Sequence, residues 1–181
     1  MKKISLLIWL MTSFLNGYSQ DNFPDSWVGN YKGKLEIYAV DSVALQLKME
    51  LNIQKTSIDS LYNWTIIYDF KGQKDIRPYE LKRVNTKKGI YQIDEKNSIV
   101  IDAFYRNKIF TSFFEVMDTF IIATYTKISD DAIVFEIISA KSKAISTTGS
   151  TTLDEEDIPQ VKTYPVDGRQ RAILHKIPYK K

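Results

Sequence analysis

Hydrophobic and polar residues alternate along most of the chain, and turn residues separate the alternating runs. The clearest run has one apolar face, formed by Val43, Leu45, Leu47, Met49, Leu51 and Ile53. A period of two is typical of a half-buried β-strand, because successive side chains of a strand point to opposite faces of the sheet. A helix would scatter the same residues around its circumference. The pattern therefore predicts a strand with one buried face.

Similar runs follow one another at short intervals, near residues 31–37, 64–70, 79–81, 90–93, 99–105, 109–116, 119–127, 132–139, 161–166 and 169–176. Most connections are too short for crossover helices, so neighbouring strands are predicted to pair antiparallel as a meander. A sheet of about ten strands exposes two edges unless it closes. We therefore expect an all-β fold, a single antiparallel meander β-barrel of about ten strands, with a two-sheet sandwich as the alternative.

The first 19 residues have the features of a signal peptide. Two lysines precede an apolar stretch from Ile4 to Leu15, and small residues stand at Gly17 and Ser19, the positions that a signal peptidase reads. This predicts cleavage before Gln20, and export to a periplasm or out of the cell. An uncleaved interfacial anchor is the alternative. No stable membrane insertion is expected after cleavage.

Residues 139–160 break the alternating pattern. Ser, Thr, Gly and charged residues dominate this segment, and no periodic apolar face remains. It is predicted to be a long flexible loop, with a turn of helix near 153–157 as an option. No repeat or domain boundary is visible, so residues 20–181 are expected to form one barrel domain.

The composition excludes cysteine chemistry and gives no support for nucleic-acid binding. The chain has no cysteine, which excludes disulfides, a thiol nucleophile and a lipid anchor on a cysteine at the cleavage site. It has 25 basic and 22 acidic residues, and loss of the two signal-peptide lysines would leave 23 basic residues and a net charge near +1. This balance gives no electrostatic reason to expect nucleic acid as a partner.

The stretch before the first strand carries Trp27, Gly29, Tyr31 and Gly33 in the order W-V-G-N-Y-K-G. This motif resembles the entry of the calycin superfamily, in the W-x-G-x-G style of its nitrobindin-like and fatty-acid-binding branches. The resemblance implies a lipocalin-like barrel in which a basic residue of the last strand packs over the entry tryptophan. Arg169 or Arg171 would be that residue here. Alternatively, Trp27 is simply a core aromatic.

A closed barrel of this size has either a filled core or a modest cavity. Strand parity suggests an interior site, and the candidate ligand-binding residues are Trp64, Tyr68, Arg77, Tyr79 and Tyr105. If Arg77 lies near a cavity mouth beside Tyr79, it could hold the carboxylate or phosphate of an amphipathic ligand. The plainer alternative is an arginine that extends to water.

The residues favour binding over catalysis. There is no G-x-S-x-G motif, and the acidic run 154–157 fits no calcium loop. His175 is the one histidine, and its late position resembles the haem ligand of the nitrobindin-like branch. We expect a protein that is not an enzyme, has no cofactor or metal, and binds a small apolar or amphipathic molecule. The alternatives are an interaction protein with a filled core and a haem-binding barrel.

Overall fold

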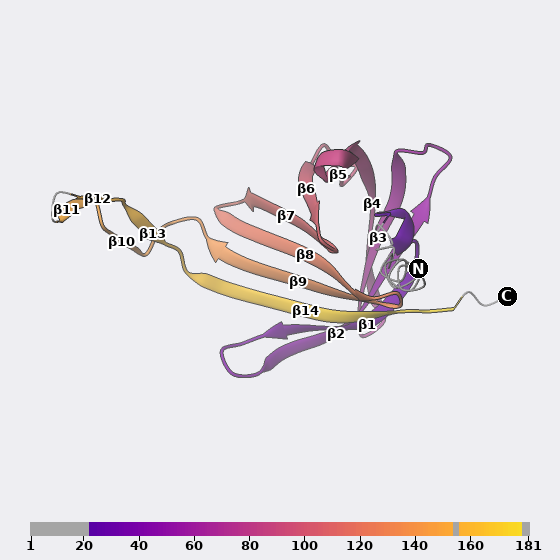
Figure 1. Cartoon of the computed structure of the whole chain (residues 1–181). Coiled ribbons are helices and arrows are strands. Elements are labelled where there is room, and N and C mark those ends of the chain that lie inside the picture. The colour runs from indigo at the N-terminus through magenta and orange to yellow at the C-terminus, as the bar shows by residue number, and fades with distance from the viewer. Residues whose placement is uncertain (1–21, 154–155, 179–181) are drawn as a thin grey trace, which may run out of the picture.

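The structure is a computed structural model that describes residues 22–153 and 156–178, so the predicted signal peptide lies outside the described residues. Ten strands form a closed antiparallel barrel (Figure 1). They are β1 (Gly29–Tyr38), β2 (Val43–Lys55), β3 (Leu61–Phe70), β4 (Gln73–Asn85), β5 (Ile90–Asp94), β6 (Val100–Arg106), β7 (Ile109–Val116), β8 (Thr119–Ser129), β9 (Ala132–Lys141) and β14 (Val166–Lys176). Two short 3₁₀ turns, η1 (Asp25–Trp27) and η2 (Thr86–Lys88), complete the barrel.

The predicted meander barrel is confirmed. β1 to β8 each pair with the next strand in the sequence, and β14 closes the barrel between β9 and β1. Met49, Leu51 and Ile53 of β2 are fully buried, as the alternation predicts, whereas Val43 and Leu45 at the start of β2 are partly exposed. Among the described residues, no helix is long and apolar enough to cross a membrane.

An aromatic plug fills one end of the barrel, which we call the closed end. Trp27 has no exposed surface, and the Phe23 ring stacks on Tyr105 at 4.4 Å and meets Trp27 edge-on at 4.9 Å. The Tyr31 hydroxyl donates a hydrogen bond to the Trp27 carbonyl oxygen at 2.9 Å. Gly33 has no room for a side chain, because a Cβ there would lie 2.1 Å from the Ile173 carbonyl oxygen. The entry motif thus packs the N-terminal turn into the barrel.

The arginines predicted to cover Trp27 lie elsewhere. β14 runs antiparallel to β1, so its last residue, Lys176, stands opposite Tyr31, with its Nζ 5.8 Å from the centre of that ring. Arg169 is seven residues earlier, about 23 Å away along a strand. It stacks on Tyr38 at the other end of β1 and pairs with Glu136 at 2.8 Å. Arg171 faces Glu36 in the same outer region.

Other cations close the barrel end. Lys127 of β8 donates to the Ser26 carbonyl oxygen at 2.8 Å, and its side chain is only 9% exposed. Arg83 of β4 pairs with Asp25 and stacks over Tyr62 at 5.0 Å. Lys127, Lys176 and Arg83 thus lie at the plug, whereas Arg169 and Arg171, the residues expected over Trp27, lie toward the other end of β1.

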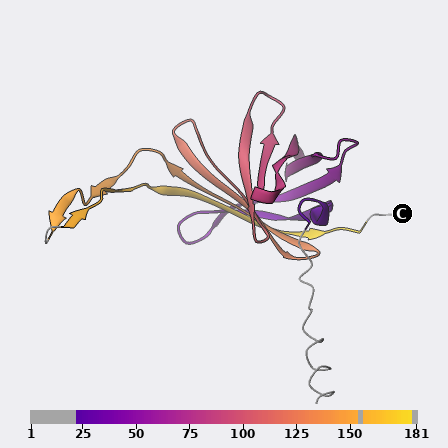
Figure 2. The ribbon, with the colours of Figure 1, turned by 45° about the horizontal axis from the view of Figure 1, so that its top comes forward.

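The segment after β9, predicted as a long flexible loop, forms an arm of short paired strands at its described residues. β10 (Ser146–Thr148) pairs with β13 (Val161–Thr163), and β11 (Thr151–Leu153) pairs with β12 (Glu156–Ile158). Figure 2 shows this arm leading away from the barrel. The turn of helix considered near 153–157 is strand over the part that the structure describes, because Leu153 pairs with Glu156 and Thr152 pairs with Asp157 in an antiparallel ladder.

Candidate ligand-binding cavity

A cavity of about 650 Å³ occupies the half of the barrel opposite the plug. One wall is mostly apolar, and the side chains that form it come from β7, β8 and β9: Phe110, Phe114, Ile121, Ala123, Phe135 and Ile137. These residues alternate along their strands, so each strand turns every second side chain toward the cavity. The core is therefore filled at one end of the barrel and hollow at the other, which the filled-core alternative did not anticipate.

An aromatic cluster separates the plug from the cavity. Trp64 of β3 meets Tyr125 edge-on, with ring centres 5.1 Å apart, and lies 5.5 Å from Phe110. Tyr125 also packs against Phe135 at 5.0 Å. Burial raises the pKa of Tyr125, so its phenol stays protonated at physiological pH. The floor of the cavity is a set of uncharged, flat rings.

Three polar residues of the cavity, Tyr68, Arg77 and Tyr79, lie together on β3 and β4. The Arg77 guanidinium lies 4.9 Å from the centre of the Tyr68 ring and pairs with the Asp75 carboxylate at 2.9 Å. Burial raises the pKa of Tyr68 to about 12 and also raises that of Tyr79, to which the nearby charge of Glu95 adds. β3 and β4 thus contribute two neutral phenols and one cation to the cavity.

The Arg77–Asp75 pair is accessible to a ligand. The Arg77 side chain is 45% exposed and that of Asp75 is 56% exposed. An ion pair at this exposure contributes about 0–1 kcal/mol. A ligand anion can therefore replace or share the Asp75 carboxylate at little cost.

Four of the five predicted binding residues line the cavity: Trp64, Tyr68, Arg77 and Tyr79. Tyr105 does not, because it lies near the start of the β6–β7 hairpin, at the closed end, stacked on Phe23. Its inward parity was predicted correctly, but its height along the barrel was not. Sequence reasoning also missed Ser112 and Glu95. Ser112 follows the alternation of inward residues in β7, and Glu95 continues the inward alternation of Tyr91 and Ile93 just past the end of β5.

His175 is exposed on the outer face of β14, between the buried Leu174 and the barrel end. Neighbouring residues of a strand point to opposite faces, so its imidazole points away from the interior that Leu174 faces. A haem inside the cavity would not receive this ligand.

Comparisons with known proteins show the fold. No protein-family model and no curated protein matches the chain in sequence. The S-type phycobiliprotein lyase CPES from Guillardia theta matches in structure with a TM-score of 0.60 at 7% identity, over 86% of this chain and 91% of that one. A protein of unknown function from the DUF3598 family of Nostoc punctiforme matches with a TM-score of 0.53 at 9% identity, over 84% of this chain and 48% of that one. At these identities the two matches show a shared fold alone.

One expectation needs correction after these comparisons. The lack of a recognisable catalytic motif led us to expect a protein that is not an enzyme. A barrel with the same fold is a lyase, so this architecture is compatible with catalysis and the expectation is wrong as stated. A catalytic group in such a barrel need not be the Cys, His or G-x-S-x-G serine that the sequence was searched for.

Proposed function

We propose that the barrel binds a small amphipathic molecule, with its apolar part inside the cavity and an anionic end at Arg77. The cavity is the observation that carries the proposal. Its volume of about 650 Å³ lies within the range of small-molecule sites, roughly 300–1,000 Å³. Such a site serves a carrier and an enzyme alike.

The polar residues favour a carboxylate, phosphate or sulfonate as the ligand's polar end. Arg77 offers a planar set of N–H donors, and its exposed partner Asp75 competes weakly for them. The phenols of Tyr68 and Tyr79 remain protonated at neutral pH because burial raises their pKa, so they can donate to the same anion. A linear tetrapyrrole is a reasonable candidate, since a protein of this fold is a phycobiliprotein lyase.

The proposal is tested by fluorescence titration of residues 20–181 with 1-anilinonaphthalene-8-sulfonate, followed by displacement with dodecanoate, dodecanol or biliverdin. Arg77→Gln should weaken dodecanoate binding about 10–100-fold, because a hydrogen bond to a charged group contributes about 1.5–3 kcal/mol. Binding of dodecanol, which has no charge, should stay the same.

Arg169→Gln is the matched control. Arg169 is 51% exposed, pairs with a carboxylate at 2.8 Å and stacks on a tyrosine at 5.0 Å, as Arg77 does, but it lies outside the cavity. This variant should bind dodecanoate like the wild type. A second variant, Ala123→Phe, puts a ring into the cavity and should abolish binding of all probes. Unchanged binding by Ala123→Phe would refute the proposal.

We further propose that the chain belongs with the calycin barrels and acts after export. The entry motif from Trp27 to Gly33 and the signal-like residues 1–19 support these two statements. Export would determine the compartment in which the protein meets its ligand. Neither statement changes the binding experiment.

A further inference from the structure

β6 and β7 share a shorter ladder than the other neighbouring strands of the barrel. Residues 100–116 are described without a gap, and over this stretch the register holds three pairs: Phe104 with Thr111, Tyr105 with Phe110, and Arg106 with Ile109. Every other pair of neighbouring barrel strands shares five or more. The wall is therefore least continuous between β6 and β7.

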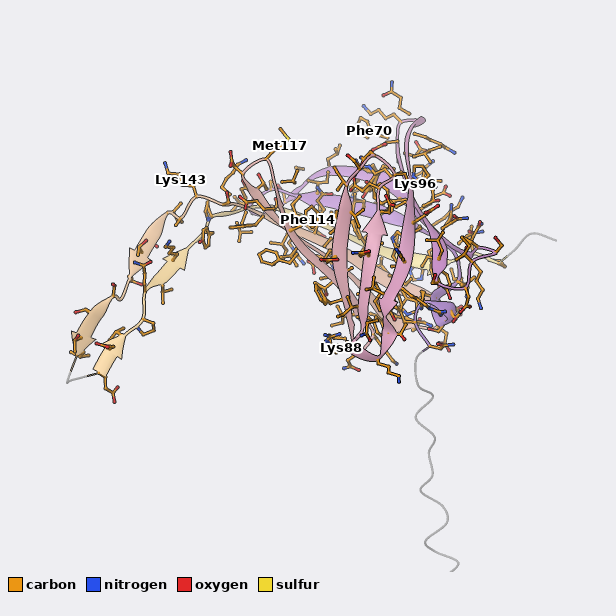
Figure 3. The ribbon with its side chains drawn as sticks, turned by 90° about the horizontal axis from the view of Figure 1, so that it is seen from above. Phe70, Lys88, Lys96, Phe114, Met117 and Lys143 are labelled. Carbon is orange, nitrogen blue, oxygen red and sulfur yellow. The ribbon has the colours of Figure 1, made fainter. Side chains whose placement is uncertain are left out.

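The three pairs lie at the closed end, where β6 is also hydrogen-bonded to the turn before β5. Arg106 donates to the carbonyl oxygens of Lys88 at 2.7 Å and Gly89 at 3.2 Å, and the Tyr105 amide donates to Gly89 at 2.9 Å. Toward the open end the β5–β6 hairpin and the β7–β8 hairpin diverge, as Figures 1 and 3 show. We call the stretch where they are unpaired, 100–103 of β6 and 112–116 of β7, the lateral slot.

The cavity reaches the lateral slot. Its lining includes Asp102 of β6 and Phe113 and Glu115 of β7. These residues alternate with the buried Ala103 and Ser112, so they belong to the outer face of the barrel. A cavity behind a continuous wall would not touch outward side chains of both strands. The cavity therefore opens sideways between β6 and β7.

We propose that the ligand enters and leaves through the lateral slot. This inference rests on the proposed function. Apolar side chains border the passage, Val100 and Ile101 on β6 and Phe114 on β7. Asp102 and Glu115 add two negative charges at its outer edge. An anionic ligand passing the slot is repelled by both, which makes the route measurable.

The first test compares association rates in stopped flow at low ionic strength. The double variant Asp102→Asn with Glu115→Gln should accelerate 1-anilinonaphthalene-8-sulfonate about fivefold, since one charge at about 8 Å in water changes the rate slightly more than twofold. The effect should disappear in 0.5 M salt, where the screening length is short. The uncharged N-phenyl-1-naphthylamine should associate at the wild-type rate.

The matched control removes two charges from turns at the open end of the barrel. Asp41→Asn with Asp118→Asn makes the same change of charge between β1 and β2 and between β7 and β8. It should leave both rates unchanged. An acceleration in this control, or none in the slot variant, would show that ligands pass the barrel's open end and would overturn the proposal.

The second test uses the lack of natural cysteines. A 5 kDa polyethylene glycol maleimide is attached to the thiol introduced by Phe113→Cys, or by Met117→Cys in the β7–β8 turn as control; both native side chains are exposed. Compared with the same variant before labelling, the group on Phe113→Cys should slow association and dissociation of N-phenyl-1-naphthylamine at least tenfold and by equal factors, so that labelling leaves the Kd of that variant unchanged. Equal rates for the two labelled proteins would overturn the slot. Failure of the unlabelled protein to bind either probe would instead refute the proposed function.

Discussion

Asp25 is the anchor of the plug, and Asp25→Asn is expected to destabilise the barrel by about 2 kcal/mol at pH 7. Its carboxylate accepts from Tyr62 at 2.9 Å and from Arg83, and both members of the Arg83 pair are mostly buried, 17% and 20% exposed. A hydrogen bond between such charged groups contributes about 1.5–3 kcal/mol. The Lys55 side chain is 63% exposed, so its ion pair with Asp25 adds little.

The loss should depend on pH. Burial raises the pKa of Asp25. The hydrogen bonds from Lys55, Tyr62 and Arg83 lower it by more than burial raises it, so the pKa of Asp25 lies below its usual value. A carboxyl whose pKa is lower in the folded chain stabilises the fold above its unfolded pKa of about 4, and this stabilisation is lost as the pH falls through the folded pKa. The difference between wild type and Asp25→Asn should therefore shrink between pH 5 and pH 2.

The assay is urea unfolding of residues 20–181 followed by far-ultraviolet circular dichroism, at pH 7 and in steps down to pH 2. Two kcal/mol corresponds to a fall of about 0.7–2 M in the urea midpoint, and of about 4–8 °C in the Tm of a thermal melt, for a domain of this size. Asp59→Asn is the control, because this fully exposed carboxylate reaches the same Arg83 at 3.7 Å and should be replaced without measurable effect. Equal stability of Asp25→Asn and wild type at pH 7, or a difference that persists at low pH, would refute the reasoning.

Three further predictions concern the rest of the chain. Gly33→Ala should destabilise the barrel by about 1–3 kcal/mol in the same assay, because its Cβ would meet the Ile173 carbonyl oxygen at 2.1 Å; an unchanged midpoint would contradict this packing. Replacing residues 143–163 by Asn-Gly should leave Tm within about 2 °C, since the arm strands pair only with one another and are exposed. Mass spectrometry of protein secreted from a bacterial host should find Gln20 as the first residue, and an intact residue 1 would contradict the predicted cleavage.

The barrel could be predicted from the sequence because period-two alternation reports directly which face of a strand is buried. Met49, Leu51 and Ile53 in β2, and Trp64 with Tyr68 in the next strand, turn inward as their spacing predicts. Closure followed from the number of strands and the short connections. The buried face is a property of each single strand, and closure depends on the number of strands, so both can be predicted from one sequence.

Height along the barrel could not be predicted, because it depends on register between strands. Arg169 has the charge expected near Trp27, yet its pairing with the far end of β1 places it beside Tyr38. Tyr105 has the inward parity of a cavity residue, yet it lies in the part of β6 that packs on the plug. The alternation shows only whether a side chain points into or out of the barrel. The register between strands sets its position along the barrel axis, and a shift of register moves it by whole residues.

The lateral slot shows the same limit for hydrogen bonding between strands. Residues 99–105 and 109–116 alternate as regularly as the paired strands around them, and nothing in that pattern indicates that pairing stops above Phe104 and Thr111. Pairing ends where the β5–β6 and β7–β8 hairpins diverge as separate twisted ribbons toward the open end (Figure 1). The residues that line this opening therefore look like ordinary strand residues in the sequence. Phe113 distinguishes a continuous wall from one that opens between β6 and β7. In a continuous wall its outward side chain would be remote from the ligand, and here it borders the cavity.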